Sequence, residues 1–253
     1  MDWVLNLGRR RDTLGMSSLS VVLLDVGGTL WSERQFTVPR EQLPAERKQR
    51  LEATGVSAGQ VERLYAELDA HVHGADDLDY FDVWSAVQQA CVNAGVVGVS
   101  ADAVRRAMSL PAKTFMQPLP GVGRLLKTIR ELGLGCVIVS NAIWRTQADY
   151  WDDLRMFGLG DLVDAVVSSV DTLWRKPNRR FYEIALQAAA APADACLMVG
   201  NSEAKDIVPA VASGMLAVRV AIEDDRPTVS RANFVCDSLE QVGAIVRGIH
   251  RDG

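Results

Sequence analysis

The chain has 253 residues, of which 48% are hydrophobic and 23% are charged, and its formal net charge is −5. This balance is typical of a globular protein with enough residues for one large or two small domains. The only tight basic run is Arg9-Arg10-Arg11, so nucleic-acid binding is not expected, because a phosphate backbone needs a basic face. No stretch approaches the ~20 apolar residues that cross a bilayer, and the N-terminus does not follow the pattern of a secretory signal. We therefore expect a cytoplasmic protein that binds no membrane.

Four cysteines are widely spaced and form no CxxC pair: Cys91, Cys136, Cys196 and Cys236. The last three lie inside apolar runs of the sequence. Buried, reduced thiols are therefore the favoured interpretation, ahead of disulfide bonds or a metal site.

The first part of the chain predicts one strand followed by a long helical block. Residues 1–19 show little periodicity and are expected to form an extension outside the fold. Residues 20–25 form a continuous apolar run that ends in an acid, as in a parallel strand covered on both faces. Residues 32–117 contain no convincing strand, but apolar residues at helical spacing predict several helices. These helices are expected around residues 61–72, 81–91 and 104–108.

Beyond residue 118, apolar runs alternate with helical patterns. The runs are 134–140, 164–169, 195–200, 216–220 and 233–236, and helical spacing occupies 122–132, 181–188 and 207–213. Strands that alternate with helices predict βα units and a parallel sheet covered on both faces, which is a doubly wound, Rossmann-like α/β fold. In such a sheet the ligand binds at the carboxyl ends of the strands.

Four polar segments fall at or just beyond the predicted strand ends. They are Asp25-Val-Gly-Gly-Thr29, Ser140-Asn141, Lys176-Pro177 with Phe181, and Gly200-Asn201 through Asp206. Over residues 20 to 240, their order and spacing resemble the four motifs of the haloacid dehalogenase superfamily. The resemblance implies a hydrolase with a core domain of residues 20–31 and 118–253 and an inserted helical cap domain of residues 32–117.

The side chains of these segments suit nucleophilic chemistry on an anion. A carboxylate beside a Gly-Gly-Thr turn is open to ligand, and the backbone N–H groups of such a turn can cradle an anion. Asp25 is therefore the predicted nucleophile, giving an acyl-phosphate or an ester, and Thr29 belongs to the same catalytic set. Ser140 is expected to hydrogen-bond a phosphoryl oxygen, and Lys176 to offset negative charge. Further substrate contacts are expected from Gly27, Gly28, Asn141 and Arg145.

Two positions depart from the pattern of the superfamily. Its phosphatases carry a second Asp, which serves as general acid/base, where this chain has Gly27. Losing a positioned proton donor should cost on the order of 10²–10⁴ in rate. The resemblance also implies a Mg²⁺ site made by Asp25, the carbonyl of Gly27, residue 201 and Asp206. Residue 201 is Asn instead of Asp, and Mg²⁺ prefers anionic oxygens, so we expect weak Mg²⁺ binding or none.

The favoured function is hydrolysis of a small phosphorylated metabolite through an aspartyl-phosphate at Asp25. One alternative is a metal-independent 2-haloacid dehalogenase-like hydrolase, because halide leaves without a proton, although residue 27 is not the tyrosine that those enzymes carry. Another is a catalytically degenerate member that binds a ligand or a protein partner. A phosphonate hydrolase would need a lysine from the cap, and Lys48 and Lys113 look like linker or surface positions.

Overall fold

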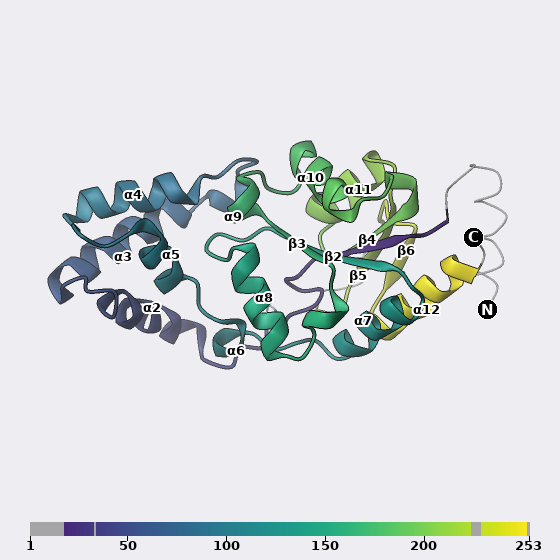
Figure 1. Ribbon diagram of the computed structural model, residues 1–253, viewed down its shortest axis with the longest axis horizontal. Coiled ribbons are helices and arrows are strands. Elements are labelled where there is room, and N and C mark those ends of the chain that lie inside the picture. The colour runs from purple at the N-terminus through teal and green to yellow at the C-terminus, as the bar shows by residue number, and fades with distance from the viewer. Residues whose placement is uncertain (1–17, 33, 224–228, 252–253) are drawn as a thin grey trace.

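Six parallel strands form one sheet with the order β3-β2-β1-β4-β5-β6 (Figure 1). The computed structural model describes residues 18–32, 34–223 and 229–251. The strands are β1 (Val21–Leu24), β2 (Gly135–Ser140), β3 (Ala165–Ser168), β4 (Cys196–Gly200), β5 (Leu216–Val220) and β6 (Phe234–Cys236). Each strand lies within one of the predicted apolar runs, and the predicted doubly wound α/β fold is confirmed. The extension predicted for residues 1–19 falls almost entirely outside the described residues.

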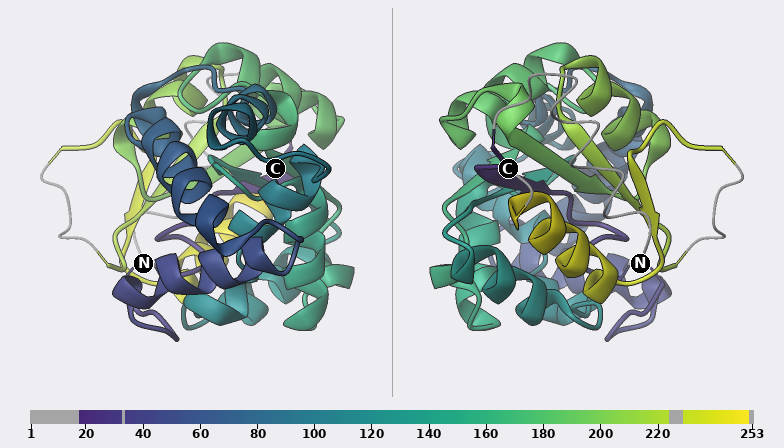
Figure 2. Two further views of the ribbon diagram at one scale, coloured as in Figure 1. Left: turned by 90° about the vertical axis from the view of Figure 1, so that its left-hand side faces the viewer. Right: turned by 90° about the vertical axis from the view of Figure 1, so that its right-hand side faces the viewer.

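The strands are apolar throughout because both faces of the sheet are buried. Leu24 belongs to the hydrophobic cluster on one face and Leu23 to the cluster on the other, as the alternation of a strand requires. The first face is covered by α7 (Val122–Glu131), α8 (Gln147–Met156) and α12 (Leu239–Arg251), and the second by α10 (Arg179–Ala189) and α11 (Val208–Ala212) (Figure 2). The strand β1 lies between β2 and β4 and is parallel to both. Its carboxyl end therefore lies near the middle of the row formed by the carboxyl ends of the strands.

The inserted block is helical, and it lies at one end of the molecule, beyond the carboxyl ends of the strands (Figure 1). Its helices are α2 (Leu43–Glu52), α3 (Ala58–Val72), α4 (Val83–Ala94), α5 (Ala101–Met108) and α6 (Ala112–Phe115). The three predicted helices correspond to α3, α4 and α5, and the apolar residues that predicted them are buried or partly buried in the hydrophobic core. The sequence did not predict α2, because Leu51 is the one residue of that helix that is fully buried.

Shorter elements complete the described chain. They are α9 (Ser169–Thr172), the 3₁₀ turns η1 (Arg40–Gln42), η2 (Ala75–Asp77), η3 (Gly160–Leu162) and η4 (Ala193–Ala195), and the π-helical turn η5 (Glu203–Ile207). The four cysteines are buried and unpaired. Among the described residues, the helices are all too short or too polar to cross a membrane.

Two connecting segments join the helical block to the sheet and run side by side. The N–H of Ser32 donates to the carbonyl of Gln117 at 2.9 Å, and the N–H of Leu119 donates to Leu30 at 2.8 Å. This pairing supports a division of the chain at residues 32 and 117. We therefore propose residues 20–31 and 118–253 as the core domain and residues 32–117 as the cap domain.

Candidate active site

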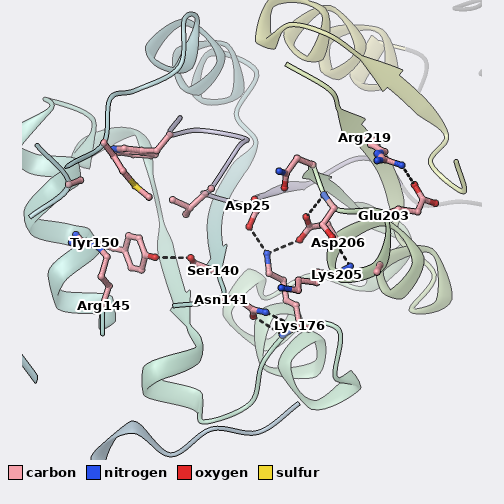
Figure 3. A pocket seen from close by; sticks show the side chains of 18 of the residues that line it. Asp25, Ser140, Asn141, Arg145, Tyr150, Lys176, Glu203, Lys205, Asp206 and Arg219 are labelled. Atoms are coloured by element: carbon pink, nitrogen blue, oxygen red, sulfur yellow. Dashed lines mark hydrogen bonds and ion pairs between the residues drawn. The ribbon is translucent and has the colours of Figure 1, made fainter. Parts of the chain in front are cut away.

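A cavity of about 690 Å³ opens at the carboxyl ends of β1, β2 and β4. All four predicted segments reach it: Asp25 follows β1, Ser140 ends β2, Lys176 follows α9, and Asp206 lies in η5 beyond β4 (Figure 3). The sheet places them together because β2 and β4 flank β1, and ligands bind where the strand order reverses.

The ammonium group of Lys176 lies between two carboxylates. Its Nζ is 2.5 Å from Oδ1 of Asp25 and 2.7 Å from Oδ1 of Asp206, and the Lys176 side chain is only 2% exposed. Burial by itself would lower the pKa of Lys176, but attraction to Asp206 and Asp25 outweighs burial and raises it. Burial raises the pKa of Asp206 to about 6, against attraction to Lys176 and with repulsion from Asp25. Lys176 is therefore a permanent cation at neutral pH.

Asp25 keeps the capacity to act as a nucleophile in this arrangement. Its Oδ1 accepts a hydrogen bond from Lys176, and its Oδ2 accepts one from the hydroxyl of Thr29 at 3.0 Å. An ionised carboxylate has about four lone-pair sites, so lone pairs remain for attack on a substrate. Thr29 is fully buried and does not line the cavity, so its contribution is to orient Asp25.

The turn after Asp25 presents Gly27, but not Gly28, to the cavity. The N–H of Gly28 donates to the carbonyl of Trp31 at 2.8 Å, whereas the N–H of Gly27 makes no backbone hydrogen bond in this turn. Gly28 has a φ of +66°, and a Cβ added to it would clash with Nδ2 of Asn201. Glycine is needed there because of its left-handed conformation and because the Asn201 side chain packs against it.

Asn141 and Asp206 both hold Lys176 in place, and neighbouring residues position Asp206 in turn. The Asn141 side chain donates to the carbonyl of Lys176 at 2.8 Å and accepts from its N–H at 2.7 Å. Oδ2 of Asp206 accepts from the N–H of Ser202 at 2.9 Å. A Cβ on Gly200 would lie 2.5 Å from Cγ of Asp206, so glycine at the end of β4 makes room for this carboxylate. The sequence predicted a substrate contact for Asn141 but not this clamp.

Ser140 and Arg145, which were predicted to contact substrate, already interact with other side chains or backbone groups of the protein. The hydroxyl of Ser140 is 2.7 Å from the hydroxyl of Tyr150. Arg145 lines the cavity, but its guanidinium pairs with Asp153, donates to the carbonyl of Leu110 and lies 5.1 Å from the centroid of the Tyr150 ring. Sequence reasoning did not identify Tyr150 or Asp153 as site residues. Their spacing of three predicts one shared helix face, but nothing in the sequence shows that this face meets the cavity.

The donors at the implied Mg²⁺ site do not fit a tightly held ion. Both oxygens of Asp206 are already bound, one by Lys176 and one by Ser202, and Asn201 offers a neutral oxygen. The carboxylate of Asp25 and the carbonyl of Gly27 are the donors that remain. Among the described residues, His, Cys, Asp and Glu form no group of three or more arranged to hold a metal.

Comparisons with known proteins agree with the geometry. A family model described as haloacid dehalogenase-like hydrolase matches residues 19–214. The chain is 25% identical over 144 residues to the glyceraldehyde 3-phosphate phosphatase of Methanocaldococcus jannaschii, and 32% identical over 138 residues to that of Methanothermobacter thermautotrophicus. These matches cover 54% and 52% of this chain, and in both cases the chain spans only 60% of the relative's length.

Solved structures share the fold over most of their length. A phosphatase from Thermococcus onnurineus superposes with a TM-score of 0.60 at 21% identity, covering 91% of this chain and 99% of the other. A 2-haloacid dehalogenase from Pseudomonas syringae superposes with a TM-score of 0.62 at 18% identity, covering 90% and 98%. At these identities the likeness shows the fold alone, and the fold serves both chemistries.

Replacing Lys176 with Met should destabilise the protein in a pH-dependent way. The variant leaves two buried carboxylates without a cation, at an expected cost of ~3–5 kcal/mol near neutral pH. Without Lys176 the pKa of Asp206 rises above the value of about 6 that it has in the wild type, so the variant is least affected below pH 4 and loses stability as pH rises from about 4 to above 6. Urea unfolding at pH 5 and pH 8 measures this difference.

The matched control is Lys127→Met, which removes an exposed lysine of α7 and should change the free energy of unfolding little at either pH. An equal loss of stability at both pH values for Lys176→Met would contradict the ion-pair account.

Proposed function

Because the chain belongs to the haloacid dehalogenase-like hydrolases, we propose that it is a phosphatase that transfers the phosphoryl group of a small metabolite to Asp25. The observation that carries this proposal is the placement of Asp25. It lies at the cavity with free lone pairs, oriented by Thr29 and held against the cation of Lys176. A cavity of about 690 Å³ suits a small-molecule substrate. The names of the two archaeal relatives support a phosphate ester as its substrate class.

The reaction would proceed in two displacements at phosphorus. An oxygen of Asp25 attacks, the ester oxygen leaves, and an acyl-phosphate forms on Asp25. Water then attacks the acyl-phosphate and releases inorganic phosphate. Lys176 offsets the charge that gathers on the nucleophile and on the transferred group. The N–H of Gly27, which makes no backbone hydrogen bond within the described residues, would donate to a phosphoryl oxygen.

The three charges around the nucleophile repel a phosphate dianion. Asp25 and Asp206 carry two negative charges against the one positive charge of Lys176, although over the whole cavity lining four acids face four cations. Lys205 also lines the cavity, and within the described part of the chain its ammonium forms no ion pair. We propose that Lys205 supplies part of the attraction that draws the anion in.

A dehalogenase-like reaction is the second candidate, and Gly27 is the observation that favours it. Displacement of halide needs a carboxylate nucleophile but no proton donor, and residue 27 of this chain has no side chain to donate one. Asp25 would then attack carbon and form an ester in place of an acyl-phosphate. Halide release from 2-chloropropionate distinguishes this candidate from the phosphatase.

The phosphatase proposal predicts release of p-nitrophenol from p-nitrophenyl phosphate. This leaving group needs little protonation, so the missing acid at Gly27 should not mask a working nucleophile. Asp25→Asn removes the attacking oxygen and should lower the rate by at least about 10³-fold, while the thermal unfolding midpoint stays near that of the wild type. Wild-type release no greater than that of the variant would sink the phosphatase proposal and favour dehalogenation or a binding role.

Metal removal should have a small effect on the same assay. Because Asp206 is bound to Lys176 and Asn201 is neutral, we expect EDTA to change the wild-type rate by less than about threefold. Asn201→Asp supplies a second free carboxylate, and its activity should rise on addition of Mg²⁺. A wild-type rate that falls to the level of Asp25→Asn in EDTA would show that the site needs a metal after all.

A further inference from the structure

The proposed phosphatase lacks an obvious proton donor for the leaving group. Gly27 has no side chain, and each carboxylate that lines the cavity pairs with a cation. The pairs are Asp25 and Asp206 with Lys176, Asp153 with Arg145, and Glu203 with Arg219. Hydrogen bonds from Arg231, Ser230 and Arg219 outweigh burial and lower the pKa of Glu203. A carboxylate held by a cation is a poor acid, so the donor must be of another kind.

Tyr150 is the tyrosine that lines this cavity, and its phenol hydroxyl is a candidate proton donor. It lies on α8 as a buried residue, 8% exposed, and its hydroxyl is 2.7 Å from the hydroxyl of Ser140. Figure 3 shows its ring pointing toward Ser140, on the side of Asp25 away from Glu203 and Arg219. The guanidinium of Arg145 lies 5.1 Å from the ring centroid, where a cation stabilises negative charge on the phenol oxygen.

The two neighbouring hydroxyls carry two protons but share one hydrogen bond, so one proton is free for the substrate. If Ser140 donates to Tyr150, the phenol proton is the free one, and any charge that develops on Tyr150 is met by Ser140 and Arg145. We propose that Tyr150 is the general acid that protonates the leaving group, in place of the carboxylate missing at Gly27. This assignment rests on the proposed phosphatase function.

The proton balances over the two half-reactions. As Asp25 forms its bond to phosphorus, the bond from phosphorus to the ester oxygen breaks, and that oxygen takes the proton of Tyr150. Water then attacks the acyl-phosphate and gives a proton to the phenolate. Inorganic phosphate leaves, and Asp25 and Tyr150 return to carboxylate and phenol. The cycle consumes one water and needs no other reactant.

The ionisation of Tyr150 suits both steps. Burial raises the pKa of Tyr150, against attraction to Arg145, so the residue is a neutral phenol at pH 7. A phenol is nevertheless a stronger acid than an alcohol, so proton transfer to a departing alkoxide is downhill. The phenolate that results is a strong base for the attacking water.

The test compares two esters of similar shape, p-nitrophenyl phosphate and benzyl phosphate. The alkoxide of benzyl alcohol leaves far less readily than p-nitrophenolate without a proton, so Tyr150→Phe should lower kcat/KM for benzyl phosphate by about 10²-fold or more. For p-nitrophenyl phosphate we expect a loss below about tenfold. Activity that is retained on p-nitrophenyl phosphate also shows that the variant is folded, since a misfolded protein would lose both activities equally.

Tyr182→Phe is the matched control. Tyr182 is another buried tyrosine near the site, but its hydroxyl donates to backbone carbonyls of Lys205 and Asp206, so any loss should be equal for the two esters. Lys205→Met tests whether the ammonium of Lys205, which also lines the cavity, donates the proton instead. Equal losses for Tyr150→Phe on the two esters, or a loss specific to benzyl phosphate in Lys205→Met alone, would overturn the assignment of Tyr150. A wild type inactive on both esters would instead defeat the phosphatase proposal.

Discussion

The site depends on one buried cation between two carboxylates. Lys176 is almost completely buried, and its Nζ contacts Asp25 and Asp206, which come from opposite ends of the motif order. Two ionised carboxylates cannot share a dry site without such a charge. The neighbouring structure is arranged to hold the three together: Asn141 fixes the backbone of Lys176, and Gly200 leaves room for Asp206. The strand order of the sheet brings these segments together at the carboxyl ends of the strands, and the charge of Lys176 holds the two carboxylates there.

Two of the contacts around Asp25 orient it and offset its charge, whereas two neighbouring positions contribute no charge. Thr29 and Lys176 hydrogen-bond the carboxylate of Asp25, while Gly27 has no side chain and the side chain of Asn201 is neutral. On the cap side of the cavity, Arg145, Tyr150 and Asp153 form a buried polar group on and beside α8. We regard this group as the counterpart of the missing acid, because it places a phenol and a cation next to Ser140.

The sequence predicted the sheet, and it singled out three residues that the structure brings together, because both depend on local patterns. Continuous apolar runs mark strands buried on two faces, and Asp25, Lys176 and Asp206 each follow such a run or the helix beyond it. Features that depend on partners distant in sequence were not predictable. Helix α2 has a single fully buried residue and so lacks an apolar stripe. The clamp of Asn141 on Lys176 and the approach of Tyr150 to Ser140 exist only once the strands and α8 are packed.

The central claim is that Asp25 itself receives the phosphoryl group. It is tested most directly by mixing the protein with p-nitrophenyl phosphate, quenching with acid within one turnover, and determining by mass spectrometry which peptide carries added mass. The account predicts one phosphoryl group on the peptide that contains Asp25, and no such peptide from Asp25→Asn. Release of p-nitrophenol with that peptide unmodified, or with the phosphoryl group on another residue, would contradict it.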